Sequence, residues 1–278
     1  MTHNHPLQGK VIVITGGAGV LGTSFARALA KTKAKVAILD LNEGKAMELA
    51  QELQKEGYEA IGLACNVLDK ASIEAAKDAI LSEFHQIDIL INGAGGNHPK
   101  GTTGHEFFDQ ADLSSDIQTF FDLDPSGIQF VFDLNFLGTL LPTQVFAKEM
   151  LHGGNILNVS SMNAFTPLTK IPAYSAAKAA ISNFTQWLAV YFSKTNIRVN
   201  AIAPGFFLTA QNEALLLDND GNWTPRANKI ITNTPMGRFG EADELLGALL
   251  FLIDDTAASF ITGVVLPVDG GFSAYSGV

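Results

Sequence analysis

Tyr174 and Lys178 stand four residues apart in "YSAAK", at the start of a stretch whose apolar spacing predicts a helix over residues 175–193. Residues four apart share one face of a helix, so the phenol and the ammonium come close together. Tyrosine has a reference pKa of about 10, and a nearby cation favours the phenolate and lowers that pKa toward neutrality. The pair is a candidate acid/base catalyst; the competing interpretation is an amphipathic tyrosine beside a solvated lysine.

Two further polar residues extend this candidate site. Ser161 lies 13 residues before Tyr174, at the end of a predicted strand over residues 153–161, where its hydroxyl is able to bind the substrate oxygen that the tyrosine protonates. Asn135 interrupts the apolar run "FVFDLNFLGTLL" of another predicted helix. The sequence therefore predicts a catalytic group of Asn135, Ser161, Tyr174 and Lys178.

A glycine-rich segment suggests a second site, for a phosphate-bearing ligand. Gly17, Gly19 and Gly22 have the spacing G-x-G-x-x-G between a predicted strand and a predicted helix. Glycines let the backbone turn tightly and approach a pyrophosphate, which then lies at the amino end of a helix. Asp40 ends the next strand, where a carboxylate accepts hydrogen bonds from an adenosine ribose and repels a ribose phosphate, which favours NAD over NADP. The alternative is that Asp40 caps the following helix.

The elements that must position these residues alternate along the whole chain. Seven short β-branched or apolar runs, typical of strands buried on both faces, are separated by segments with helical spacing. This pattern predicts a single α/β domain over residues 1–278, with a Rossmann-type, doubly wound parallel sheet and helices on both faces. The predicted strands lie within residues 10–19, 35–40, 59–67, 88–96, 153–161, 197–205 and 261–271, and the predicted helices cover residues 20–32, 42–57, 69–84, 128–150, 175–193 and 241–254.

Two segments are too long for simple connections. Residues 97–127 and 206–235 each follow the carboxyl end of a predicted strand, which is the side on which open α/β sheets bind ligands. We therefore expect both segments to shape a substrate pocket, the alternative being surface insertions without a role.

Composition excludes several classes of partner. A net charge of -10 and a pI near 5.0 disfavour nucleic acid and anionic membranes. The first ten residues lack the pattern of a secretion signal, and no uninterrupted apolar run reaches the length of a membrane span, so a cytoplasmic protein is expected. Cys65, the only cysteine, reads as a small buried hydrophobe, and no metal site is predicted.

In their order and spacing these motifs resemble the classical short-chain dehydrogenase/reductase family over nearly the whole chain. The resemblance includes "TGGAGVLG", "INGAGG", "LNFLG", Ser161, "YSAAK", "APGFFLT" and "VDGG". It implies that Tyr174 is the acid/base, Ser161 steadies the substrate, Lys178 also holds the nicotinamide ribose, and Asn135 holds a water in a proton relay. The implied cofactor-binding residues are Gly16, Gly17, Gly19, Val20, Leu21, Asp40, Asn66, Val67, Asn92, Gly93, Ala94, Tyr174, Lys178, Pro204, Gly205, Phe207 and Thr209.

Three positions depart from the family pattern. Val20 replaces a glycine of the glycine-rich turn, Asn66 replaces an aspartate that contacts adenine, and Asn92–Gly93 replaces a pair of asparagines. These changes bear on the pyrophosphate geometry, on adenine binding and on the support of the central sheet, in that order. None of them removes a predicted catalytic group.

The substrate is suggested by a narrower resemblance. "ITGGAGVLG", "INGAGGNHPK" and "FDLNFLGTLLPTQVFAKEM" are similar to the bacterial D-mannonate oxidoreductase, or D-fructuronate reductase, branch of carbohydrate metabolism. A sugar acid needs cations and hydrogen-bond donors, and Asn97, His98 and Arg226 are the candidates, although each is also explained as solvated surface. One alternative is a dehydrogenase of another keto-sugar acid, of the gluconate type, or of a neutral polyol. An alternative from another class is a non-catalytic redox sensor.

The apolar helices around Asn135 and Tyr174 imply a homo-oligomer, either a dimer or a homotetramer. The competing explanation is that their apolar residues belong to the buried core.

Overall fold

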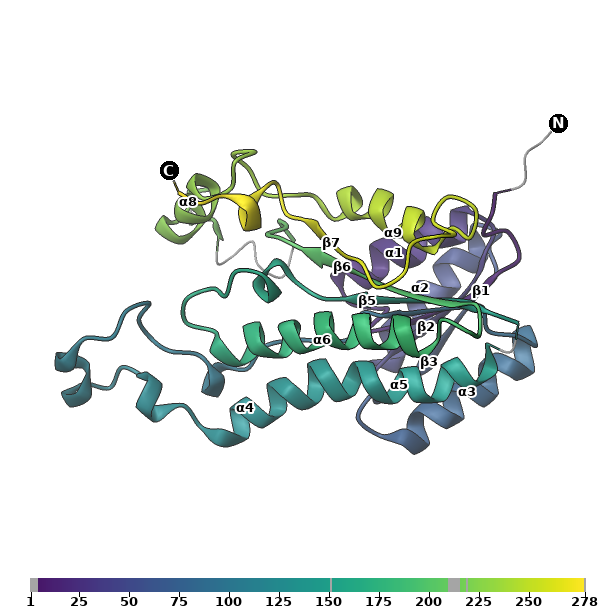
Figure 1. The fold of residues 1–278 in the computed structure, drawn as a ribbon, viewed down its shortest axis with the longest axis horizontal. Coiled ribbons are helices and arrows are strands. Elements are labelled where there is room, and N and C mark those ends of the chain that lie inside the picture. Colours follow the sequence, from purple (N-terminus) through teal and green to yellow (C-terminus); the bar gives the residue numbers. More distant parts are fainter. Residues whose placement is uncertain (1–4, 151, 210–215, 219, 278) are drawn as a thin grey trace.

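The computed structural model describes residues 5–150, 152–209, 216–218 and 220–277. Seven strands form one sheet in the order β3-β2-β1-β4-β5-β6-β7, and every neighbouring pair is parallel. This confirms the predicted doubly wound sheet (Figure 1). The strands are β1 (Val11–Thr15), β2 (Lys35–Asp40), β3 (Ala60–Ala64), β4 (Ile89–Asn92), β5 (Gly154–Val159), β6 (Ile197–Pro204) and β7 (Val265–Val268).

Helices cover both faces of the sheet, because each strand buries side chains on both sides. One core cluster joins the sheet to the first helical layer through Phe25, Leu49 and Leu249. A second cluster joins the other face to the second layer through Ile80, Phe146 and Leu188. The first layer holds α1 (Val20–Lys31), α2 (Glu43–Lys55) and α9 (Leu246–Ile253), and the second holds α3 (Lys70–Phe84), α5 (Gly138–Phe146) and α6 (Pro172–Tyr191).

The helix expected over residues 128–150 differs from the prediction. It consists of α4 (Pro125–Phe132), a π-helical turn (Asp133–Leu137), α5 and a final 3₁₀ turn. Asn135 lies in the π-helical turn, where its Nδ2 donates to the carbonyl of Val131 at 2.8 Å. π-helical turns and side chains that bond into the backbone ladder are both places where a helix bends. The whole stretch Pro125–Glu149 is long and apolar enough to cross a membrane, yet here it packs against α6 and α3 as part of the fold.

The two long connections have structures that the sequence pattern does not reveal. Residues 97–124, which we call the arm, contain three 3₁₀ turns and project beyond the amino end of α4 (Figure 1). Residues 206–235 contain the helix α8 (Pro225–Thr232), which was not predicted; residues 210–215 and 219 of this segment lie outside the described part of the chain.

Candidate active site

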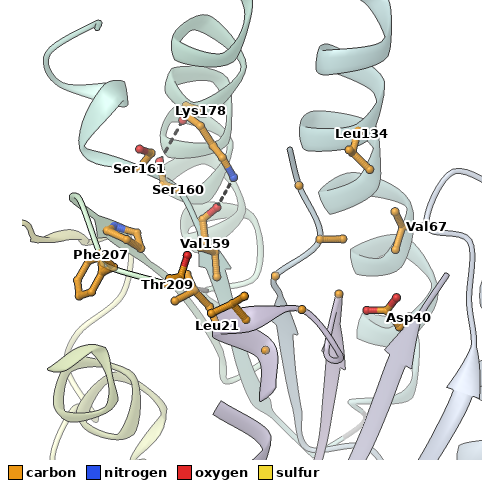
Figure 2. A pocket seen from close by; sticks show the side chains of 18 of the residues that line it. Leu21, Asp40, Val67, Leu134, Val159, Ser160, Ser161, Lys178, Phe207 and Thr209 are labelled. Carbon is orange, nitrogen blue, oxygen red and sulfur yellow. Dashed lines mark hydrogen bonds between the residues drawn. The ribbon is translucent and has the colours of Figure 1, made fainter. Parts of the chain in front are cut away.

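A cavity of about 620 Å³ opens at the carboxyl ends of the strands, beside β1 and β4. Here the chain order of the strands reverses across the sheet, the point at which open α/β sheets bind ligands. Its walls come from the glycine-rich turn, the ends of β2, β4, β5 and β6, and the first turns of α6 (Figure 2). The structure thus brings most of the predicted residues together: Gly16, Gly19, Val20, Leu21, Asp40, Asn66, Val67, Gly93, Ala94, Ser161, Tyr174, Lys178, Pro204, Gly205, Phe207 and Thr209 line it.

The glycine-rich turn forms a cradle at the amino end of α1. Gly16 has a φ of +63°, a left-handed conformation that favours glycine. A Cβ on Gly22 would lie 2.3 Å from the Gly16 carbonyl oxygen. The close approach of the helix to the turn therefore requires a residue without a side chain at position 22. Gly19 caps α1 without a side-chain hydrogen bond, and the first turn holds no acidic residue. The first backbone N–H groups of α1 are therefore available to an anion such as a pyrophosphate.

Gly17 supports the cradle from behind rather than lining the cavity. Its N–H donates to the Leu39 carbonyl at 2.9 Å, and a Cβ there would lie 2.9 Å from the Ile38 side chain. Its contribution is close packing of the turn on β2.

Asp40 is half-buried at the end of β2 and faces the cavity. Its carboxylate accepts hydrogen bonds from the N–H of Ala18 at 3.1 Å and from the N–H of Asn42 at 2.9 Å. The cap of α2 is Asn42, which accepts from the N–H of Lys45, so the alternative that Asp40 caps this helix is wrong. The carboxylate instead links the end of β2 to the glycine-rich turn.

Tyr174 and Lys178 lie one turn apart at the start of α6, as predicted. The Lys178 Nζ is 5.6 Å from the centre of the tyrosine ring and donates to the backbone carbonyl of Val159 at 2.9 Å (Figure 2). Ser161 follows β5, and its hydroxyl forms a hydrogen bond with the Tyr174 side chain. The three polar groups meet at the wall of one cavity.

Contrary to the expectation from its lysine neighbour, the pKa of Tyr174 is not lowered in the chain by itself. Burial raises the pKa of Tyr174 to about 12, and the hydrogen bond from Ser161 only partly opposes this. Burial also lowers the pKa of Lys178 to about 8, because the charged form is poorly solvated there. The phenol is therefore protonated at neutral pH and ready to act as an acid.

Asn135 is fully buried and lies behind the cavity wall. Its Nδ2 donates to the Gly96 carbonyl at 2.7 Å as well as to Val131, and its Oδ1 accepts from the Gly96 N–H at 3.3 Å. A Cβ on the neighbouring Gly95 would lie 2.7 Å from that oxygen and 3.2 Å from the Lys178 Nζ. Asn135 thus holds the segment that separates it from the cavity.

Asn92, predicted to bind cofactor, does not line the cavity. Its side chain is buried and donates to the Thr143 hydroxyl at 3.0 Å and to the Asn158 side chain at 2.9 Å. It therefore ties β4 to β5 and α5. Side chains alternate across a strand, which directs residue 92 into the packing while the backbone of Gly93 and Ala94 faces the ligand side.

The three substrate candidates lie away from the cavity wall. Asn97 donates to the Thr102 hydroxyl at 3.1 Å, and His98 accepts from the N–H of Lys100 at 3.2 Å and packs against Phe130. Arg226 is exposed in the first turn of α8. Local hydrogen bonds, rather than the cavity, set the orientation of the first two side chains.

Several lining residues were not predicted. Leu41, Cys65, Gly95, Leu134, Val159, Ser160 and Phe206 also contact the cavity. Cys65 was predicted only as a buried hydrophobe, and burial does raise the pKa of its thiol to about 11. For most of these residues the signal was adjacency to a predicted residue at a strand end, whereas Leu134 is adjacent to Asn135 in the π-helical turn.

Comparison with known proteins gives one family match and several relatives. The family model described as short chain dehydrogenase matches residues 10–220. An uncharacterized oxidoreductase of Haemophilus influenzae is 64% identical over 277 residues, covering 99% of this chain and 97% of the relative. The uncharacterized oxidoreductase UxuB of Bacillus subtilis is 52% identical over 274 residues, 98% of each chain. A crystal structure of a Haemophilus influenza protein, provisionally named a D-mannonate oxidoreductase and holding NAD, has a TM-score of 0.95, 64% identity and 99% coverage of both chains.

Proposed function

The chain belongs to the short-chain dehydrogenase family, enzymes that act on CH–OH groups, and from that premise we propose that it interconverts a sugar acid and its keto form with NAD, most specifically D-mannonate and D-fructuronate. The observation that carries the proposal is the likeness, at 64% identity, to the NAD-bound protein provisionally named for this activity. The intact Ser161, Tyr174 and Lys178 group at the cavity supports catalysis rather than sensing.

The residues around the cavity fit NAD. The N–H groups at the start of α1 would hold the pyrophosphate, and the Asp40 carboxylate would accept hydrogen bonds from the adenosine ribose. Asn66 and Val67 would border the adenine, and the segment from Pro204 to Thr209 would border the nicotinamide. When bound, NAD supplies the hydride acceptor, or NADH the donor.

The chain's own residues handle the proton. During reduction Tyr174 gives its proton to the substrate carbonyl oxygen, while the Ser161 hydroxyl donates a hydrogen bond to the same oxygen. The Lys178 ammonium stabilises the phenolate that remains, and it would also bind the nicotinamide ribose. In oxidation the same groups act in reverse, with the phenolate as base. Asn135 acts from behind, by holding Gly96 in place.

A neutral polyol is the second candidate, and one observation favours it. Among the described residues that line the cavity, Lys178 is the sole cation, and its Nζ is directed at Val159. A carboxylate substrate would need a further cation or several hydrogen-bond donors. The names of the relatives favour the sugar acid, and the lining of the cavity favours the polyol.

The test is a panel of initial rates, followed by absorbance of reduced nicotinamide. NAD and NADP are each offered with D-mannonate, D-gluconate, other hexonates and neutral polyols such as threitol. The proposal expects the highest kcat/KM with D-mannonate and NAD. Turnover of neutral polyols alone would transfer the proposal to the second candidate, and absence of turnover with every compound would overturn both.

Cellular place and assembly belong to the same proposal. We place the enzyme in the cytoplasm, where it needs neither membrane nor nucleic acid. Exposed apolar side chains on α4 to α6, among them Phe132, Leu137 and Trp187, support a dimer or tetramer built through these helices.

A further inference from the structure

The arm carries an unusual number of exposed apolar side chains for a segment that projects from the body. Phe107 is 78% exposed, and Phe120 and Phe121 are each 67% exposed. Phe108 and Leu113 are exposed as well, and no residue of the arm belongs to a hydrophobic core cluster among the residues described. Exposed apolar patches of this kind mark interaction surfaces.

The arm is nevertheless held in shape by polar bonds, most of them its own, and Glu106 pairs with Lys229 of α8. The His105 ring bonds to Asp112 at 2.9 Å, the N–H of Gly104 donates to the Gln118 carbonyl at 2.7 Å, and a capping box joins Thr119 and Asp122. Phe121 makes edge contacts with both Phe108 and Phe120, at ring separations of 5.5 and 5.6 Å. The aromatic surface is thus presented on a preformed scaffold, which lowers the entropic cost of docking.

Charge restricts the kind of partner. The arm holds six acidic residues and a single lysine, and Lys100 is already paired with Asp124 at 3.0 Å. Two triplets of the same composition, Phe107–Asp109 and Phe120–Asp122, place a carboxylate directly after two aromatic rings. A matching surface needs cations beside apolar side chains.

Such a surface exists on the same chain, at the far end of the second helical layer. A hollow of about 630 Å³ lies where α5 and α6 end, lined by Lys148, His152, Lys194 and the apolar Met150, Phe192 and Ile197. Neither lysine forms an ion pair with any described residue. The ring of Phe192 continues this surface to the exposed Tyr191, at a separation of 5.3 Å.

The arm cannot reach its own hollow. The helical stretch Pro125–Glu149 separates them, and its 25 residues span roughly 37 Å at about 1.5 Å per residue. Figure 1 shows the arm beyond the amino ends of α4 and α6, while both helical segments run away from it toward the end that holds the hollow. A second copy with its helices antiparallel would place each arm beside the partner's hollow and form both contacts at once, as two-fold symmetry requires.

We propose that the arm of one chain docks into the basic, partly apolar hollow at the ends of α5 and α6 of a second copy. The acidic triplets meet Lys148 and Lys194, and the phenylalanines cover Tyr191 and Phe192. This contact is separate from the substrate cavity and does not depend on which substrate the enzyme takes.

The first test measures association of the full chain by sedimentation velocity over a range of concentrations. The double variant Phe107→Ser, Phe120→Ser should weaken association at least tenfold, because a few buried aromatic side chains dominate such interfaces. Phe260→Ser is the matched control, since this ring is fully exposed outside both surfaces. An unchanged association constant in the double variant, equal weakening in the control, or a wild-type chain that stays monomeric would each overturn the proposal.

The second test asks which surfaces meet. Cys65 is the only cysteine and is 3% exposed, so a bismaleimide should react with the introduced cysteines and not with Cys65. One protein carrying Asp116→Cys is mixed with another carrying Lys194→Cys, and a short bismaleimide is added. We expect a mixed dimer, whereas Asp116→Cys mixed with the exposed Lys45→Cys should give little product. Equal yields in the two mixtures, or no mixed dimer in the first, would show that the arm does not lie at this hollow.

Discussion

The ammonium of Lys178 donates to the carbonyl oxygen of Val159, 2.9 Å away, at the end of β5. Lys178 is 4% exposed, and burial lowers its pKa to about 8. One backbone oxygen therefore holds a charged group that is otherwise poorly solvated. This hydrogen bond ties α6 to the end of β5, and its effect on stability depends on pH.

Lys178 should make stability depend on pH in alkaline solution. Its folded pKa of about 8 lies below the ordinary value of 10.5, so between these values the unfolded chain binds more protons and the contribution of Lys178 to the free energy of unfolding rises with pH. In urea unfolding at pH 7, 8, 9 and 10, the stability of Lys178→Met relative to wild type should therefore decline above pH 8, by about 1 kcal/mol per pH unit at most.

Lys45→Met, at an exposed position, is the control for this comparison and should show a constant difference from wild type. A constant difference for Lys178→Met as well would mean that the folded pKa of Lys178 is not lowered.

Removing the Tyr174 hydroxyl should stop catalysis without stopping cofactor binding. We expect Tyr174→Phe to lower kcat by about 10²–10⁴-fold, the contribution of a positioned acid or base. Quenching of protein fluorescence by NADH should still give a Kd within a few fold of wild type. Turnover of the variant near the wild-type rate would show that another group moves the proton.

The same hydroxyl should make the two reaction directions respond oppositely to pH. Burial raises the pKa of Tyr174 to about 12, so the acid form needed for reduction prevails at neutral pH, whereas oxidation needs the phenolate. The kcat/KM for oxidation should therefore rise between pH 6 and 9, and that for reduction should not. An oxidation rate independent of pH over this range would contradict the assignment of Tyr174 as the base.

Removing the charge of Asp40 should relax the choice of cofactor. Asp40→Asn keeps one oxygen to accept from the backbone but loses the charge that repels a ribose phosphate. The ratio of kcat/KM with NAD to that with NADP should fall at least tenfold, a change of about 1.4 kcal/mol. Glu43→Gln, an exposed acid at the start of α2, makes the same charge change and should leave the ratio unaltered. The same small change in both variants would mean that Asp40 does not face the ribose.

A single methyl group at Gly95 should disturb catalysis. In Gly95→Ala the new carbon would lie 2.7 Å from the Asn135 Oδ1 and 3.2 Å from the Lys178 Nζ, so one of the two side chains must shift. We expect kcat to fall at least tenfold while the melting temperature changes by a few degrees. In Gly247→Ala, in α9, the new carbon would meet no atom of the described residues within 4 Å, so this variant should retain wild-type kcat. A wild-type kcat in Gly95→Ala would mean that catalysis does not depend on the exact position of the Lys178 side chain.

The sequence allowed prediction of the fold and most of the cavity wall because both depend on local patterns. Tyr174 and Lys178 share a helical face by spacing alone, and Asp40 follows a strand whose apolar run ends there. The side chain of Asn92 could not be oriented in this way, since its direction depends on the register between β4 and β5, where Asn92 opposes Asn158. The orientation of His98 likewise depends on local bonds within the arm, which has no periodic pattern to read.

The order of the strands has a consequence during biosynthesis. The first four strands, β3-β2-β1-β4, are adjacent in the sheet and come from residues 11–92, whereas β5 begins only at Gly154. At roughly 5–20 residues per second, the apolar strand Ile89–Asn92 stays an open sheet edge on the ribosome for several seconds. Open apolar edges pair readily with other chains, so this interval is where a nascent chain is most exposed to aggregation. Synonymous codons that slow translation between β4 and β5 should therefore reduce the yield of folded protein.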